Sequence, residues 1–397
     1  AKEYWDDRLK KVATFASTDE YLLMNGCDHQ PVQADLGKAI EVASELYPDI
    51  NFKHSNFPEY IKAIKEKVPN DLAVVKGELT SQDTDGWSTL MNCASSHIYL
   101  KQMNRKCESA LENGAEPVRV LSSVLGQNYP SDELEYSWKK LMQNHPHDSI
   151  CCCSVDEVQD EMATRFNKSK QVADYLVSEG KRYIADKINT KEYEKYKNAL
   201  PFVVFNTTGR ERTSVVSVEI DVTRKSGWLK KCAYDLDEIN VPNYKLIDSI
   251  PFKIEDLGVK FGYDLPKDKF RQPYMARRVR VTFEAENISA VGYKTYALVE
   301  GDTEKVTDTL VSSENCMEND AIRVEINKNG SLNVTDKASG RTYKGVAYYE
   351  ETGDLGNEYM YKMPEGSKAI TTQDTVAKIE LAEDEPYRAM YKITNTK

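Results

Sequence analysis

A long helical stretch, residues 155–188, constrains the fold of this chain more than any other feature. Its apolar side chains recur near every 3.5 residues, and a helix this long and regular buries one face in a bundle. Ser154 and Glu157 stand at its start with the spacing of a capping box, in which the two side chains bond orphan backbone N–H groups. A free coiled coil would need cleaner core positions, so the pattern predicts a helical bundle.

Partner helices for this bundle are predicted just before the long stretch. The first of them carries Leu100, Cys107 and Leu111 on one side, and Gly114 follows as a glycine that ends a helix. The expected segments are 95–112, 118–125 and 131–143. With residues 155–188 they predict a three-helix bundle within residues 79–198.

Residues 1–78 alternate between short helical and short strand-like patterns. Helices are expected at 5–15, 36–46 and 58–67, and strands at 21–24, 50–54 and 72–75. Such alternation is typical of a parallel α/β sheet, in which ligands bind beyond the carboxyl ends of the strands. The first strand is followed at once by a polar loop, residues 25–31, which therefore lies where a ligand would bind.

From about residue 199 the chain is rich in β-branched and aromatic residues, which favours strands. The Asn329-Gly330 pair between two such runs predicts a tight hairpin. Expected strands are 202–205, 214–222, 278–283, 293–299, 322–326, 332–335 and 387–394. They predict one β-sandwich in residues 199–312 and the start of a second, larger one in 313–397, so the fold class is a multidomain α/β + α + β chain.

Charge and composition exclude several function classes. The net charge is −11 and the isoelectric point is near 5.2, whereas nucleic-acid and anionic-membrane partners call for a basic face. No run of about 18 apolar residues is present, and the first residues lack the pattern of a signal peptide. Eight cysteines, three of them consecutive, form no secreted disulfide framework, so we expect a reduced, cytoplasmic setting. The sequence allows a homo-oligomer without specifying one.

Two histidines and a carboxylate occupy the connection between the last two predicted helices. They are His145, His147 and Asp148, followed by the cysteines of residues 151–153. Imidazole is the commonest metal ligand among side chains, and an adjacent carboxylate can hold substrate or orient a ligand. Histidines at a helix end also serve as caps or packing residues, and the residues alone leave both interpretations open.

The polar loop of residues 25–31 is a second candidate site. Gly26 permits a tight turn at the strand end, and Asp28 could then act as a general acid or base in the crevice. Asn-Gly and Asp near a proline are also ordinary loop residues, and most such loops have no catalytic role.

The segment from His147 to Ile150, the cysteine run and Ser154-x-Asp156-Glu157-Val158 resemble the α-mannosidases of glycoside hydrolase family 38, especially the bacterial branch. The resemblance implies a zinc enzyme that hydrolyses α-mannosides or mannose-containing oligosaccharides. It further implies that His147 is a zinc ligand and that Asp148 contacts the bound sugar. The loop of residues 25–31 is similar to the family's strand-end loop, which implies that Asp28 is the general acid/base.

The resemblance extends to both sides of this motif. Residues 77–79 and 95–102 look like the entry into the family's helical bundle, and residues 353–359 look like a landmark of its β-domains. In bacterial members we expect an arginine where His97 stands, and in the family an acid where Asn357 stands. Residues 1–78 then correspond to the end of the barrel-like catalytic domain.

The family's first zinc-binding strand and its nucleophilic aspartate have no counterpart in this sequence. We therefore expect the chain to be an internal piece of a longer enzyme that binds zinc poorly and hydrolyses nothing alone. The implied reaction is retaining hydrolysis by two carboxyl groups. The competing hypothesis is a non-catalytic carbohydrate-binding or scaffold protein that uses aromatic residues such as Trp87 to stack on sugars.

Overall fold

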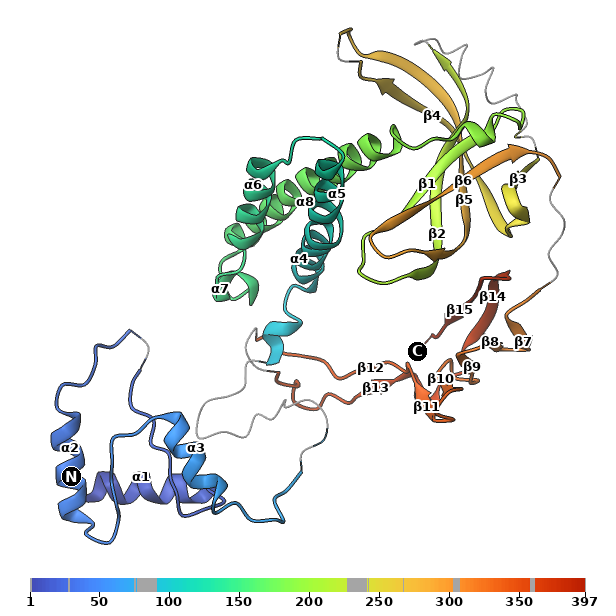
Figure 1. Ribbon diagram of the computed structural model, residues 1–397. Helices are drawn as coiled ribbons and strands as arrows, with labels where there is room; N and C mark the ends of the chain where they lie inside the picture. The colour runs from blue at the N-terminus through green and yellow to red at the C-terminus, as the bar shows by residue number, and fades with distance from the viewer. Residues whose placement is uncertain are drawn as a thin grey trace. The chain divides into compact units, whose positions relative to one another are not determined.

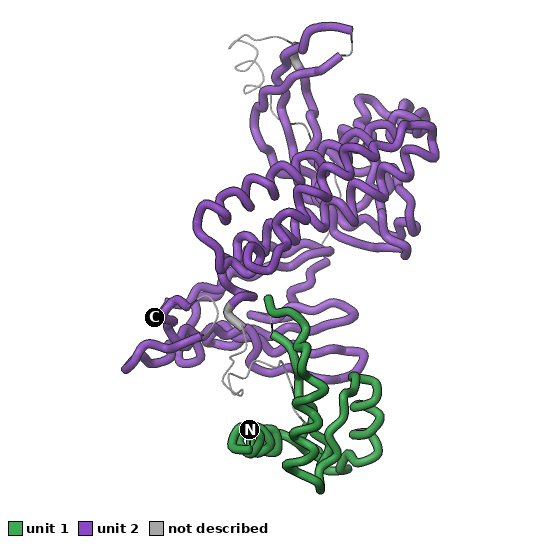
Figure 2. The backbone as a smooth tube through the Cα atoms, turned by 90° about the vertical axis from the view of Figure 1, so that its left-hand side faces the viewer, with its two compact units in different colours: residues 1–91 green, residues 92–397 purple. Residues whose placement is uncertain are grey.

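The computed structural model describes residues 2–27, 29–74, 76, 91–226, 241, 243–266, 268–302, 308–357 and 361–396. The chain forms two compact units, residues 1–91 and 92–397, coloured separately in Figure 2. Among the described helices, none combines the length and the apolar character that a membrane span requires. The predicted domain boundaries inside the second unit stay a prediction.

The first unit contains the three helices that its sequence predicts. They are α1 (Lys2–Phe15), α2 (Leu36–Leu46) and α3 (Phe57–Lys65). Helix α3 begins with a side-chain cap, because the backbone N–H of Glu59 donates to the Asn56 side-chain oxygen over 3.0 Å. The rings of Trp5 and Phe52 meet edge to face with centroids 5.3 Å apart and hold α1 against the segment before α3.

The strands predicted in this unit are not formed in its described part. Residues 21–24, 50–54 and 72–74 make no strand pairing, and residue 75 lies outside the described residues. A strand needs a neighbour to accept and donate its backbone hydrogen bonds, and apolar content does not supply one. Met24 and Val74 are 66% and 79% exposed, so the apolar pattern marks surface that this unit does not cover.

The helical bundle of the second unit follows the predicted order (Figure 1). Helix α4 continues through a π-helical turn, η2, into α5, while α6 and the long α8 pack beside them. A short helix, α7, connects α6 to α8, and a 3₁₀ turn, η1, precedes α4. The bounds are η1 (Met91–Ala94), α4 (Ile98–Ala110), η2 (Leu111–Ala115), α5 (Glu116–Val124), α6 (Ser131–Met142), α7 (His147–Ile150) and α8 (Asp156–Ala185).

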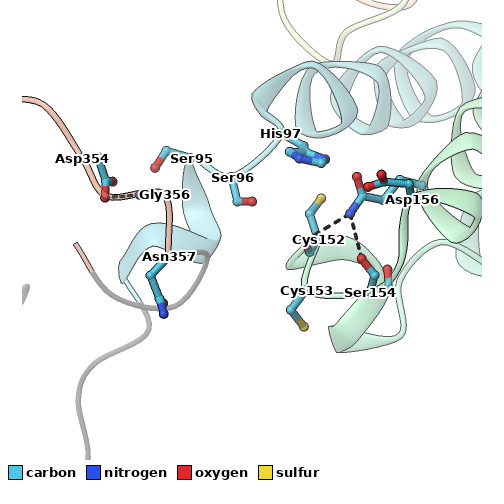
Figure 3. Close-up of a pocket in the computed structure, with 11 residues that line it drawn as sticks. Ser95, Ser96, His97, Cys152, Cys153, Ser154, Asp156, Asp354, Gly356 and Asn357 are labelled. Atoms are coloured by element: carbon cyan, nitrogen blue, oxygen red, sulfur yellow. Dashed lines mark hydrogen bonds between the residues drawn. The ribbon is translucent and has the colours of Figure 1, made fainter. Parts of the chain in front are cut away.

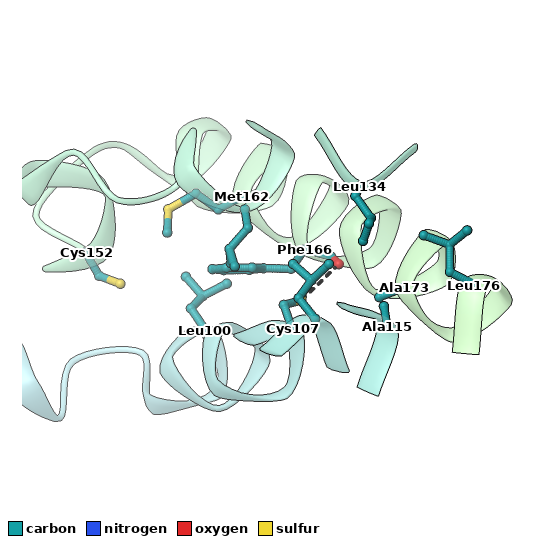
Figure 4. Packing of buried hydrophobic residues seen from close by; sticks show 11 residues of the cluster. Leu100, Cys107, Ala115, Leu134, Cys152, Met162, Phe166, Ala173 and Leu176 are labelled. Carbon is teal, nitrogen blue, oxygen red and sulfur yellow. Dashed lines mark hydrogen bonds between the residues drawn. The ribbon is translucent and has the colours of Figure 1, made fainter. Parts of the chain in front are cut away.

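The bundle core lies on the apolar faces that the periodicity predicts (Figure 4). Phe166 is fully buried in α8 between residues of α4 and α6, and the Cys107 thiol donates to its carbonyl oxygen over 3.2 Å. Residues at helix ends depart from the prediction: Ile98, Met142 and Val155 are at least half exposed, because the buried face ends before the helices do. The fully buried core includes Leu100, Leu111, Leu141, Met162 and Phe166.

The predicted capping box of α8 is absent. Val155 occupies the N-cap position, so Ser154 lies one residue too early, and its buried hydroxyl has no hydrogen-bond partner. The Gln159 side chain instead fixes the preceding turn by donating to the carbonyl oxygens of Ser154 and Cys152 over 3.0 and 3.3 Å. The start of α8 is therefore held by an amide from inside the helix.

Gly114 does not end α4, contrary to the prediction. The chain stays helical through η2 into α5 and stops at Gly126, which has φ +97° and donates its N–H to the Ser123 carbonyl. A Cβ at position 114 would lie 3.0 Å from the Val177 side chain of α8. The glycine therefore permits close packing between helices, which local sequence does not distinguish from a helix end.

Two three-stranded antiparallel sheets face each other after the bundle. One has the strand order β1-β6-β3 and the other β2-β5-β4, as the sandwich prediction requires. Phe283 of β5 meets Phe202 of β1 and Tyr296 of β6 edge to face, with centroids 5.9 and 4.8 Å apart. The bounds are η3 (Lys191–Tyr193), β1 (Leu200–Asn206), β2 (Arg212–Ser226), β3 (Tyr244–Leu246), η4 (Ile247–Ser249), β4 (Phe252–Asp264), β5 (Gln272–Ile288) and β6 (Gly292–Glu300).

The last part of the chain forms a five-stranded sheet, in the order β11-β10-β9-β8-β7, and two strand pairs, β12-β13 and β14-β15. The predicted Asn329-Gly330 turn joins β9 to β10, and Gly330 has the positive φ of +83° that such a turn needs. The bounds are β7 (Val311–Ser313), β8 (Cys316–Glu318), β9 (Ile322–Ile326), β10 (Leu332–Asp336), β11 (Thr342–Val346), β12 (Glu350–Glu351), β13 (Ile370–Thr371), η5 (Thr372–Asp374), β14 (Lys378–Glu385) and β15 (Arg388–Thr394).

Candidate active site

The short helix α7 presents the predicted histidine and aspartate from a rigid base. Asn144, three residues before it, is fully buried and donates through its side-chain amide to the Met162 carbonyl of α8 over 3.3 Å. The N–H groups of Ser149 and Ile150 both donate to the Pro146 carbonyl, at 2.9 and 3.0 Å. A buried anchor and a closed helical turn therefore fix the backbone under the pair.

His147 and Asp148 lie side by side and open to solvent. His147 Nε2 is 3.3 Å from Asp148 Oδ1, and their side chains are 90% and 71% exposed. His145 has a different environment, because its Nε2 is 2.8 Å from the Asn104 side-chain oxygen of α4. The structure thus gives His145 a packing contact and leaves His147 available to a ligand.

Asp28, the predicted acid/base, lies outside the described residues, and its role stays a prediction. The loop around it turns at Gly26, which has φ +143°, a conformation that residues with a side chain rarely adopt. The N–H of Gln30 donates to the Cys27 carbonyl over 3.4 Å.

A group of thiols lies beneath Asp148. Lys101 of α4 donates through Nζ to Cys152 Sγ over 3.1 Å and to the Ser96 carbonyl over 2.5 Å, which ties the start of α4 to the turn after α7. Cys153 Sγ is 3.5 Å from Asp148 Oδ1. Cys152 is buried, Cys151 and Cys153 are half-buried, and no disulfide joins the described cysteines. No sequence pattern points to a role for Lys101, because the thiol that it contacts is far away in the chain.

Cys93 adds a fourth thiol, which the sequence patterns do not single out. Burial, with a smaller contribution from the neighbouring Cys151 thiol, raises the pKa of Cys93. We expect iodoacetamide at pH 8 to alkylate the exposed Cys27 before Cys93, because only thiolates react and burial also restricts access. Time-resolved alkylation followed by peptide mass spectrometry measures this order. Faster labelling of Cys93 than of Cys27 would show that Cys93 is open and acidic.

A pocket of about 470 Å³ lies next to this thiol group (Figure 3). Its walls come from four places: the segment leading into α4, the turn between α7 and α8, the start of α8, and the loop that follows β12. His97 takes the left-handed region with φ 44° just before α4. The lining residues are Ser95, Ser96, His97, Cys152, Cys153, Ser154, Asp156, Gln159, Asp354, Gly356 and Asn357.

The pocket adjoins the His147-Asp148 pair through one residue. Cys153 lines the pocket, and its thiol reaches Asp148. The sequence resemblance singled out the segments that contain His97 and Asn357. No local pattern predicts that these segments form one pocket with the turn before α8, because they lie far apart in the chain.

The donors of the α7 pair fit zinc as part of a site. Imidazole and carboxylate are both ligand types that zinc takes, and catalytic zinc sites use three protein ligands. In the described ranges of the chain, no group of three or more His, Cys, Asp or Glu side chains is arranged to hold a metal ion. His147 can therefore supply a donor to zinc only together with other groups.

Comparison with known families places the bundle and the first sandwich. The family model described as "Alpha mannosidase middle domain" matches residues 88–184, and the model described as "Glycosyl hydrolases family 38 C-terminal domain 1" matches residues 197–300. The chain belongs to glycosyl hydrolase family 38. The family 38 middle-domain match contains α7 and all the pocket residues except those of the loop after β12.

Family 38 relatives align with the whole chain. A protein of Halalkalibacterium halodurans named "Putative mannosylglycerate hydrolase" is 42% identical over 414 residues, and this chain covers 45% of it. A crystal structure of an alpha-mannosidase from Enterococcus faecalis V583 is 43% identical, with TM-score 0.75, and a second family 38 structure from Enterococcus faecalis is 38% identical, with TM-score 0.72. The chain covers 45% of each of these two as well. These matches confirm the mixed multidomain fold class.

Proposed function

We propose that the complete protein that contains this chain is a retaining, zinc-dependent α-mannosidase. The supporting observation is the His147-Asp148 pair, which a buried anchor presents to solvent within the stretch that matches the α-mannosidase middle domain. An exposed imidazole beside a carboxylate contributes little to stability, and its geometry suits a ligand. No disulfide joins the seven described cysteines, which supports a reducing, cytoplasmic setting for this enzyme.

The residues of this chain have distinct roles in the proposed reaction. His147 donates its imidazole nitrogen to zinc, and Asp148 accepts hydrogen bonds from hydroxyl groups of the bound mannosyl unit. Zinc, when bound, orients sugar hydroxyls and supplies positive charge. A carboxylate nucleophile of the complete protein would attack the anomeric carbon while Asp28 protonates the departing oxygen. Water, giving a proton to Asp28, would then displace that carboxylate and release mannose.

The names of the relatives point to α-mannosides and leave two classes of leaving group. One name specifies mannosylglycerate, and the other specifies an alpha-mannosidase without a leaving group. The mannosyl unit is common to both, so we propose an α-mannoside as substrate. Because the isolated chain offers only part of the zinc donors in its described residues, we expect this polypeptide alone to bind zinc poorly and to hydrolyse no mannoside.

The stereochemistry of the product tests the proposed mechanism. The complete gene product is mixed with an aryl α-mannoside, and the anomeric proton of the released mannose is followed by NMR from the first seconds. A retaining enzyme releases α-mannose first, and the β-anomer appears later by mutarotation. First release of β-mannose would refute retention, and hydrolysis of aryl α-glucosides but not α-mannosides would refute the substrate class.

A further inference from the structure

The pocket beside the α7 pair has a charge that bears on the choice of leaving group. We propose that this pocket, lined by residues 95–97, 152–154, 156, 159, 354, 356 and 357, receives the leaving group and selects an uncharged, hydroxyl-rich group over one that carries a carboxylate. The inference rests on the proposed α-mannosidase function and specifies its substrate further.

The pocket lies beside the candidate site. The pocket shares a wall with the candidate site, because Cys153 lines it while the Cys153 thiol lies 3.5 Å from Asp148 Oδ1. The pocket is therefore within reach of the aglycone of a mannosyl unit held at Asp148. A volume of about 470 Å³ is within the range of small-ligand sites, about 300–1,000 Å³.

The wall of the pocket is polar. Ser95 and Asn357 lie together on one side of the pocket, and Ser154 lies on the other, as Figure 3 shows. Such groups donate and accept hydrogen bonds and suit the hydroxyl groups of a sugar. Apolar side chains of any size are absent from the described lining, which argues against an alkyl or aryl group as the natural leaving group.

The described lining of the pocket carries negative charge. The carboxylic acids that line the pocket are Asp156 and Asp354, and its described lining contains no lysine or arginine. The Lys101 ammonium contacts two lining residues, because it bonds the Ser96 carbonyl and the Cys152 thiol. A carboxylate in the pocket would meet like charges, and the described lining offers no guanidinium or ammonium to pair with it, so binding of a carboxylate is disfavoured. A second sugar carries no such cost.

Paired substrates test this selection in the complete gene product. We measure kcat/KM for an α-linked mannobiose and for the α-mannoside of glycerate, and expect the first to exceed the second by at least about tenfold. His97→Arg adds a permanent cation to the wall, so we expect the ratio to move toward the glyceryl substrate by about tenfold. Asp354→Asn removes a negative charge and should move the ratio in the same direction by less.

Tyr175→Lys is the matched control, because it adds a cation on the exposed side of α8, outside the pocket, where Tyr175 is 61% exposed. It should leave the ratio unchanged. A wild-type preference for the glyceryl substrate, or ratios that neither pocket variant changes, would overturn the inference while leaving the mannosidase function in place. Hydrolysis of neither substrate nor of an aryl α-mannoside would remove the proposed function itself.

Discussion

Replacing His147 by alanine in the complete gene product is expected to lower kcat/KM for an aryl α-mannoside by more than about 100-fold. Loss of groups that merely orient a zinc ligand costs 10–100-fold, and loss of a ligand should cost more. The fold should persist, because the His147 side chain is 90% exposed and its described contact is the carboxylate of Asp148. Steady-state kinetics and zinc content by atomic absorption measure the effect.

His145→Ala is the matched control for this variant. His145 lies two residues away and contacts the Asn104 side-chain oxygen of α4 at 2.8 Å, away from the proposed zinc position. We expect nearly normal zinc content and activity, with a small loss of stability from the missing hydrogen bond. Equal losses of activity in the two variants would indicate a structural role for both histidines and would count against zinc binding by His147.

Phe166→Ala should destabilise the helical bundle by about 3–5 kcal/mol, the usual cost of removing a buried aromatic side chain. Phe166 is fully buried and packs among residues of α4, α6 and α8, so the cavity would open at the centre of the bundle. Hydrogen exchange of the α8 amides, followed by mass spectrometry on this chain, reads the local stability without assuming that the whole chain unfolds at once.

Tyr175→Ala on the same helix provides the comparison, since Tyr175 is 61% exposed. Its expected effect on stability lies within about 0.5 kcal/mol. If the α8 amides of the two variants exchanged at the same rate, the bundle core would not be centred on Phe166.

The sequence correctly predicted the elements that are determined by residues close together in the chain. The apolar period of α8 placed Met162 and Phe166 in the core, and the Asn329-Gly330 pair predicted the turn between β9 and β10. In both cases the residues that determine the structure lie within a few positions of each other, so their periodicity or turn chemistry carries the information.

Predictions failed where the structure of a segment depends on another segment far away in the chain. Residues 21–24 and 50–54 have strand composition, yet they form no pairing in the described residues. The sequence around Gly114 is typical of a helix end, but in the structure this glycine allows Val177 of α8 to pack closely against it. Both outcomes depend on which segment lies opposite, which composition and period do not encode.

The candidate site also has one part that the sequence predicts and one part that it does not. His147 and Asp148 are neighbours in the sequence, and the resemblance to family 38 identified them before the structure placed them side by side. The pocket next to them was not predictable, because it joins Ser95–His97 to the turn before α8 and to the Asp354–Asn357 loop. Lys101 and Cys93, which support that turn, also act across a long separation in sequence.

The central claim is that this family 38 chain contributes a zinc ligand to an α-mannosidase. Hydrolysis of an aryl α-mannoside by the complete gene product, measured before chelation, after chelation and after zinc is restored, tests it most directly. We predict that chelation abolishes turnover and that stoichiometric zinc restores it. Full turnover after the metal has been removed would contradict zinc dependence. No turnover on any α-mannoside would contradict the whole claim and favour a carbohydrate-binding or scaffold role for the bundle and sandwiches.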